Sequence, residues 1–295
     1  MSGHIVVGYK ATKTGRDAVA FAARLAAAIG GALEVAVILP AEGRSVITPP
    51  DASYDRYLRT LAQEWIAEAI GRVPDGVTAR GHVRSADSFA EGLIGLAREL
   101  SAGYIVVGAG DGGLRGRHRL GTTNNQLLYS SEVPVVLVPR GARKIAAGTG
   151  ITRLTVAVSP RPGDGALMAD AAALASATGI PVRLLSLLAI DLPVAANTAA
   201  ARLARSDAAA DVLAAMNARL PDGLEAEVVV ADGDSIEDAV AGLDWQPGEI
   251  LLAGSSRLAQ PRRLFLGATA AKMLHEVPVP AVVVPRPREQ DGAGA

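Results

Sequence analysis

The chain has 295 residues, with 29 Lys and Arg against 30 Asp and Glu, and only 3% of its residues are aromatic. This charge balance and the scarcity of aromatic rings argue against a nucleic-acid or membrane-surface partner, because such partners need basic patches and stacking side chains. The absence of Cys excludes disulfides, thiol catalysis and Cys-ligated zinc. No apolar run approaches the roughly 20 residues of a membrane span, and the first residues carry no signal-peptide pattern. We therefore expect a cytoplasmic protein.

The first half of the chain alternates short apolar runs with amphipathic segments. Five runs are rich in apolar residues, as is typical of buried parallel strands: 4–9, 33–39, 77–83, 104–108 and 133–138. Helical spacing of apolar residues predicts helices over 14–29 and 54–70, a third that is capped by Ser85 or Asp87 and ends at Leu100, and a fourth that begins at Gly121. This alternation predicts an α/β fold with a mostly parallel, doubly wound sheet of five strands flanked by helices.

The pattern then restarts. The segments that repeat it are 154–158, 164–178, 182–188, 195–220, 225–230, 235–243, 250–254 and 267–276. The closing strands also match, since the sequence Glu-Val-Pro-Val begins both of them, at Glu132 and at Glu276. We infer an internal duplication. We expect a first domain over residues 1–142 and a second domain over residues 152–286. A Gly- and Ala-rich linker, 143–151, joins them, and a disordered tail, 287–295, follows.

A glycine-rich loop follows the fourth strand of the first half. The apolar run ends at Gly108, a loop rich in Gly and Arg follows, and Gly121 and Thr122 begin a helix. Glycines let a backbone approach a ligand closely, and the free N–H groups at a helix start attract anions. The three parts together predict a phosphate-binding cradle. The design recurs in the second half at Gly254 and Gly267.

These features resemble the universal stress protein family in its tandem form, over nearly all of both halves. The resemblance rests on the order of strands and helices, on the two Val-Pro-Val closing strands and on the glycine loop. In nucleotide-binding members this loop reads Gly, two residues, Gly, nine residues, Gly and then Ser or Thr. The resemblance implies two Rossmann-like domains of the adenine-nucleotide α-hydrolase-like class, ATP as the ligand of a subset of members, and pairing through the last strand. It also implies a regulatory role in the stress response.

Neither half keeps the whole loop pattern. Asp111 replaces the middle glycine in the first half, and Arg257 replaces it in the second half, where Ala268 also replaces the hydroxyl residue. Binding members carry an Asp after the first strand, and Lys10 and Ser159 stand at the matching positions here. The first half is therefore the better candidate for binding ATP or another anion.

The candidate ligand-binding residues combine loop glycines, hydroxyl groups at a helix start and two cations. They are Lys10, Gly108, Gly110, Arg115, Gly121, Thr122, Thr123, Gly254 and Gly267. Gly110 offers an alternative to the missing middle glycine. The charge of Arg115 would offset that of Asp111.

Three kinds of function remain open: a regulatory nucleotide-binding stress protein, a ligand-free interaction module that acts through protein partners, and an enzyme of the adenine-nucleotide class. The spelling G-x-G-x-x-G at 108–113 follows the fourth strand, whereas a dinucleotide fingerprint follows the first. The four His are scattered without metal-ligand spacing, and no Gly-x-Ser-x-Gly occurs. We expect no metal and no catalytic residues, with at most slow ATP turnover, and we favour the first reading.

The duplication also predicts how the chain assembles. Two similar halves can form an internal pseudo-twofold pair through their closing strands, 134–138 and 280–284, since unpaired strand edges attract partners. We further expect the whole chain to form a homodimer.

Overall fold

The structure is a computed structural model. It describes residues 3–41, 52–110, 121–158, 165–187, 199–221, 224, 226–231, 233–255 and 268–285. Arg115 and Gly267, the departures at Asp111, Ser159 and Arg257, and the expected tail all lie outside these ranges. Among the helices within them, none combines the length and the apolar character needed to cross a bilayer.

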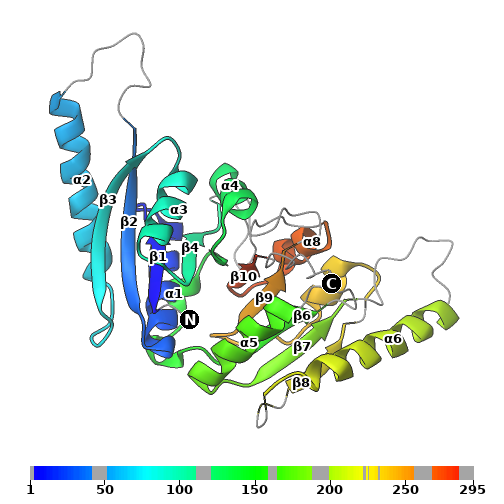
Figure 1. The fold of residues 1–295 in the computed structure, drawn as a ribbon. Coiled ribbons are helices and arrows are strands. Elements are labelled where there is room, and N and C mark those ends of the chain that lie inside the picture. The colour runs from blue at the N-terminus through cyan, green and yellow to red at the C-terminus, as the bar shows by residue number, and fades with distance from the viewer. Residues whose placement is uncertain are drawn as a thin grey trace, which may run out of the picture.

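The first half alternates five strands with four helices (Figure 1). These are β1 (His4–Gly8), α1 (Lys13–Ile29), β2 (Ala32–Pro40), α2 (Ala52–Ile70), β3 (Ala79–Ala86), α3 (Phe89–Glu99), β4 (Tyr104–Gly108), α4 (Thr122–Ser130) and β5 (Val135–Val138).

The second half repeats this order after two short 3-10 helices, η1 (Ala142–Lys144) and η2 (Ala147–Thr149). Its elements are β6 (Leu154–Val158), α5 (Gly165–Thr178), β7 (Val182–Ser186), α6 (Ala199–Asn217), β8 (Ala226–Val230), α7 (Ile236–Ala241), β9 (Ile250–Gly254), α8 (Ala268–Glu276) and β10 (Ala281–Val284).

All these strands form one ten-stranded sheet, in the order β3-β2-β1-β4-β5-β10-β9-β6-β7-β8. Neighbouring strands are parallel within each half. The two halves join through β5 and β10, which pair antiparallel with Val136 opposite Val282. The predicted pairing of the two closing strands is therefore confirmed.

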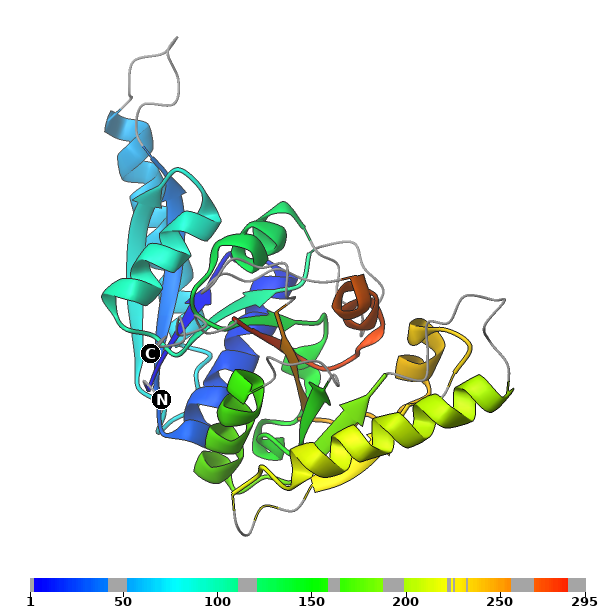
Figure 2. The same ribbon diagram turned by 45° about the vertical axis from the view of Figure 1, so that its right-hand side comes forward.

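The core lies in two layers, one on each face of the sheet. Because side chains alternate along a strand, Ile5 and Val7 of β1 face the layer that holds α1, α2, α5 and α6. Val6 faces the layer that holds α3, α4, α7 and α8. Figure 2 shows α1, in blue, beside α5, in green, and these two helices contact each other across the halves.

Side-chain caps fix where the helices begin. Thr12 caps α1, since its hydroxyl accepts a hydrogen bond from the backbone N–H of Gly15 at 3.1 Å. Ser88 caps α3 in the same way, through the N–H of Glu91 at 3.1 Å. The predicted caps of α3, Ser85 and Asp87, were wrong. Strand β3 continues to Ala86, and Ser85 is paired with β2 inside that strand.

The connection between the halves is held to α1. The buried carboxylate of Asp17 accepts hydrogen bonds from the backbone N–H groups of Gly141 and Arg143, both at 3.0 Å. The guanidinium of Arg143 also lies 2.9 Å from this carboxylate. On the same helix, Arg24 donates to the carbonyl of Ala142. The segment expected to be a linker is thus ordered at its start and anchored on the first half.

Candidate functional site

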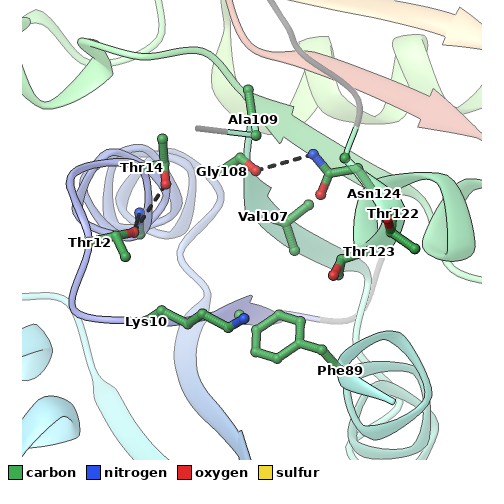
Figure 3. Close-up of a pocket in the computed structure, with 14 residues that line it drawn as sticks. Lys10, Thr12, Thr14, Phe89, Val107, Gly108, Ala109, Thr122, Thr123 and Asn124 are labelled. Atoms are coloured by element: carbon green, nitrogen blue, oxygen red, sulfur yellow. Dashed lines mark hydrogen bonds between the residues drawn. The ribbon is translucent and has the colours of Figure 1, made fainter. Parts of the chain in front are cut away.

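A cavity of about 320 Å³ lies at the carboxyl ends of β1 and β4 (Figure 3). These two strands are neighbours in the sheet, but the chain leaves them in opposite directions, toward β2 and toward β5. Open α/β sheets bind ligands at such switch points, because the loops that follow the two strands diverge there and leave a crevice.

Five short segments line this cavity. They are Gly8 and Lys10 after β1, Thr12, Thr14 and Gly15 at the start of α1, Phe89 at the start of α3, Val107, Gly108, Ala109 and Gly110 at the end of β4, and Gly121, Thr122, Thr123 and Asn124 at the start of α4.

Two glycines bring the start of α1 against the ends of the strands. A Cβ atom on Gly108 would lie 2.5 Å from the carbonyl oxygen of Thr14, and a Cβ atom on Gly15 would overlap the carbonyl oxygen of Lys10. Both obstacles are backbone atoms, so neither contact could be relieved by a side-chain movement. Gly108 was predicted to let the backbone approach a ligand, and the structure gives it a packing role against α1.

The start of α4 is open toward the cavity. Its N-cap residue is Gly121, which has an ordinary φ of −83° and provides no side-chain cap. The first N–H groups of a helix have no intrahelical acceptor, so those of Thr122 and Thr123 remain available to a ligand. The side-chain amide of Asn124, which is only 5% exposed, donates to the carbonyl of Gly108 at 3.3 Å. This bond fixes the start of α4 to the end of β4.

Lys10 extends along the cavity to Phe89. Its Nζ atom lies 4.9 Å from the centroid of the Phe89 ring, a cation–π distance. The Phe89 ring packs against Gly8, since a Cβ atom added to Gly8 would lie 2.9 Å from the Cε1 atom of Phe89. Lys10 is the one ionisable side chain among the lining residues named above, so the charge of this lining is positive. The hydroxyls of Thr12 and Thr14, 3.0 Å apart, add polar groups on the α1 side.

The structure brings most of the predicted first-half residues together. Six of them line the cavity: Lys10, Gly108, Gly110, Gly121, Thr122 and Thr123. Gly254 does not line it and lies instead at the end of β9 in the second half. Among the residues that the structure describes, a Cβ atom on Gly254 would lie 3.8 Å from Leu167, an ordinary contact distance.

Sequence reasoning missed four polar or aromatic side chains of the lining: Thr12, Thr14, Phe89 and Asn124. Thr12 had a detectable signal, since a Thr before a helical pattern is a common N-cap. Phe89 and Asn124 had none, because only the fold places the starts of α3 and α4 beside the end of β1.

Comparison with known proteins identifies the family. The model of the universal stress protein family matches residues 1–139 and 150–285. The chain belongs to the universal stress protein family. It is a tandem member, with one domain of the family in each half, as the resemblance implied.

Relatives cover this universal stress protein from end to end. It is 33% identical over 299 residues to a universal stress protein of Mycobacterium tuberculosis H37Rv, an alignment that covers 95% of this chain and 99% of the relative. A universal stress protein of Mycobacterium bovis matches equally well, with 33% identity over 299 residues and the same coverage of 95% and 99%.

Solved structures share the fold. The crystal structure of a universal stress protein from Archaeoglobus fulgidus superposes with a TM-score of 0.66 at 16% identity, over 97% of this chain and 99% of that one. A functionally unknown protein from Pseudomonas aeruginosa gives a TM-score of 0.56 at 18% identity, over 96% and 93% of the two chains. The predicted fold class, two tandem Rossmann-like domains, is confirmed.

Proposed function

We propose that this universal stress protein is a regulatory protein whose first half binds an adenine nucleotide, such as ATP, or another small anion. One observation carries the proposal. The start of α4, which lacks a side-chain cap, and the cation of Lys10 line one cavity at the switch point of the first half. The volume of about 320 Å³ falls at the lower end of the range for small-molecule sites.

The start of α4 supplies the anion cradle. A phosphate group placed there would accept hydrogen bonds from the N–H groups of Thr122 and Thr123 and would interact favourably with the positive end of the helix dipole. Gly121 leaves room for this approach, because no atom of the described residues lies within 4 Å of the position that its Cβ atom would occupy. No carboxylate stands among the cavity residues that the structure describes, so nothing in this lining repels the anion.

The lining favours binding over catalysis. Hydrolysis of a phosphate ester needs a group that activates water or acts as a nucleophile near the reacting phosphorus. Lys10 is the one ionisable side chain in the lining named above, and an ammonium group has no lone pair with which to activate water. Occupancy of the site is therefore the event that carries the signal.

Helix α1 offers a route by which occupancy reaches the rest of the chain. Thr14 lines the cavity, and Asp17, less than one turn further along α1, binds the backbone of Gly141 and Arg143 at the connection between the halves. A ligand that shifts the start of α1 would move this anchor. We further propose that the protein acts in the cytoplasm, which the absence of Cys supports, and that the whole chain forms a homodimer.

Titration calorimetry with ATP on Gly121 variants tests the cradle. In Gly121→Asp the new carboxylate has room, caps the N–H groups of α4 and adds negative charge, so we expect affinity to fall by about tenfold or more. Gly121→Asn caps the same N–H groups without adding charge, so its affinity for ATP should lie between those of Gly121→Asp and the wild type. Gly121→Ala is the steric control and should bind within about twofold of wild type.

Two results would count against the proposal. Unchanged affinity in Gly121→Asp would remove the cradle from α4. An absence of binding heat with ATP and with other small anions in the wild type would favour the alternative, an interaction module that acts through protein partners.

A further inference from the structure

Lys10 is the cation of the cavity lining. No carboxylate within the described ranges pairs with it, and its contact is the face of Phe89. Figure 3 shows Lys10 and Phe89 on the side of the cavity across from Gly108 and Asn124. The positive charge of this side lies across the cavity from Asn124 in the first turn of α4, and no carboxylate neutralises it in the part of the protein that the structure describes.

The side of the cavity at Lys10 suits an anion better than a nucleobase. A base would bind there by stacking on Phe89, the one aromatic ring in the lining, but the Lys10 ammonium already occupies a face of that ring at 4.9 Å. The ring cannot withdraw easily, because it packs against Gly8. The cation–π contact leaves the N–H groups of Lys10 that point away from the ring free to donate to a ligand.

Asn124, in the first turn of α4, presents an acceptor on the side of the cavity opposite Lys10 (Figure 3). Its side-chain nitrogen donates to the carbonyl of Gly108, which can only accept, so the orientation of the amide is fixed. The oxygen of the amide points into the cavity (Figure 3), and no described residue donates to it. Asn124 is 5% exposed as a residue, and its oxygen is open to the cavity, where a ligand can donate to it. The ligand is thus expected to carry a hydroxyl or amine group at this point.

We propose that the cavity selects a ligand with two separated anionic groups, one bound at the start of α4 and one by Lys10, and with a hydrogen-bond donor that reaches Asn124. Among nucleotides, this chemistry describes a nucleoside bisphosphate with phosphates on two positions of the ribose, in contrast to a nucleoside di- or triphosphate, whose phosphates all lie at one end. The inference rests on the proposed function, because its first anion uses the cradle at α4.

Two isomeric probes test this inference on the full-length protein by titration calorimetry. Adenosine 3′,5′-bisphosphate and ADP share their base, their sugar and their number of phosphates, and they differ in where the second phosphate lies. We expect the 3′,5′-bisphosphate to bind about tenfold more tightly, since it alone gains a charge-assisted hydrogen bond to Lys10.

Variants of two lysines assign the preference to its source. Lys10→Met keeps the length of the side chain without its charge, and it should bring the two affinities within about twofold of each other. Lys13→Met is the matched control, because Lys13 is exposed, lies three residues further on and does not line the cavity. This control should keep the preference of the wild type.

The outcomes separate this inference from the proposed function. If ADP binds as well as the 3′,5′-bisphosphate and Gly121→Asp weakens it, the cradle stands and the two-anion ligand is wrong. A preference that persists in Lys10→Met would also overturn the inference. If neither nucleotide binds, both the inference and the proposed nucleotide site fail.

Discussion

Glu34 and Arg183 occupy matching positions in the two halves of the sheet, and they are buried charges of opposite sign. Glu34 stands on β2 opposite Arg80 of the edge strand β3, whereas Arg183 stands on β7 opposite Glu227 of the edge strand β8. The two halves therefore share a buried charge next to an oppositely charged edge residue, with the signs exchanged. Buried charges of this kind are stable only with partners, which makes both clusters sensitive to substitution.

The cluster of the second half predicts a large effect of one neutral substitution. Glu249 is fully buried, and its carboxylate lies 2.7 Å from Arg183 and 2.9 Å from Arg153. Glu249→Gln would remove the one buried counter-charge that Arg183 and Arg153 share in the described cluster and leave them the exposed Glu227, so the free energy of unfolding should fall by about 3–5 kcal/mol. Urea unfolding at neutral pH measures this change in the free energy of unfolding.

The control for this substitution is Glu99→Gln. Glu99 pairs with Arg84 at 2.9 Å, but its side chain is 57% exposed. The same chemical change there should cost about 1 kcal/mol or less. Equal losses in the two variants would contradict a stabilising role for the buried cluster.

The cluster of the first half predicts acid sensitivity. Burial acts to raise the pKa of Glu34, but hydrogen bonds from His82 at 2.7 Å and His4 at 2.9 Å outweigh it, and the pKa lies below its ordinary value of 4.5. A carboxyl group whose pKa is lowered by folding stabilises the protein above its unfolded pKa, and this contribution is lost as the pH falls through the folded value. The free energy of unfolding should therefore decline as the pH falls below about 4.5.

Urea unfolding at a series of pH values checks this dependence. Glu34→Gln removes the titrating group, so its stability should decline less steeply in the acid range than that of the wild type. An identical slope in the two proteins would show that other carboxyl groups cause the acid sensitivity.

The geometry of the cavity predicts opposite outcomes for two Gly→Ala changes. In Gly108→Ala the new methyl group would lie 2.5 Å from the backbone oxygen of Thr14, so the start of α1 must move. We expect a loss of about 1–3 kcal/mol in stability, together with weaker ligand binding. Gly121→Ala has open space, and its stability should stay close to that of the wild type. Thermal unfolding distinguishes them, and equal melting temperatures would argue against the close packing at Gly108.

The strands and helices could be predicted well because buried parallel strands form continuous apolar runs, as 104–108 shows. The N-cap of α3 could not be predicted, because Ser85, Asp87 and Ser88 lie within four residues. Only the pairing of β3 with β2 shows that the strand reaches Ala86. Local sequence offers several polar residues for one cap, and the tertiary structure decides among them.

The residues that line the cavity could be predicted where their position depends on the local sequence. Gly121 and Thr122 stand at the start of one helix, and their sequence neighbours suffice to show it. Phe89 and Asn124 reach the cavity from two other places in the chain, so their contribution appears only when β1 and β4 are neighbours in the sheet. The packing role of Gly108 was missed for the same reason, since its contact is Thr14, 94 positions earlier in the chain.

The pairing of β5 with β10 predicts the behaviour of a separated first half. A fragment of residues 1–145 keeps the anchor between Asp17 and Arg143, and it exposes the edge of β5 that otherwise binds β10. Because unpaired strand edges attract equivalent edges, we expect this fragment to form a dimer through β5. Sedimentation equilibrium measures its mass, and a well-folded monomer would contradict this expectation.

The central claim is that the first half binds an anionic ligand between α4 and Lys10. A crystal structure of the full-length protein grown with adenosine 3′,5′-bisphosphate tests it most directly. We expect one phosphate within hydrogen-bond distance of the backbone nitrogens of Thr122 and Thr123, and the other beside the ammonium of Lys10. An empty cavity at saturating ligand, or a nucleotide bound elsewhere on the protein, would contradict it.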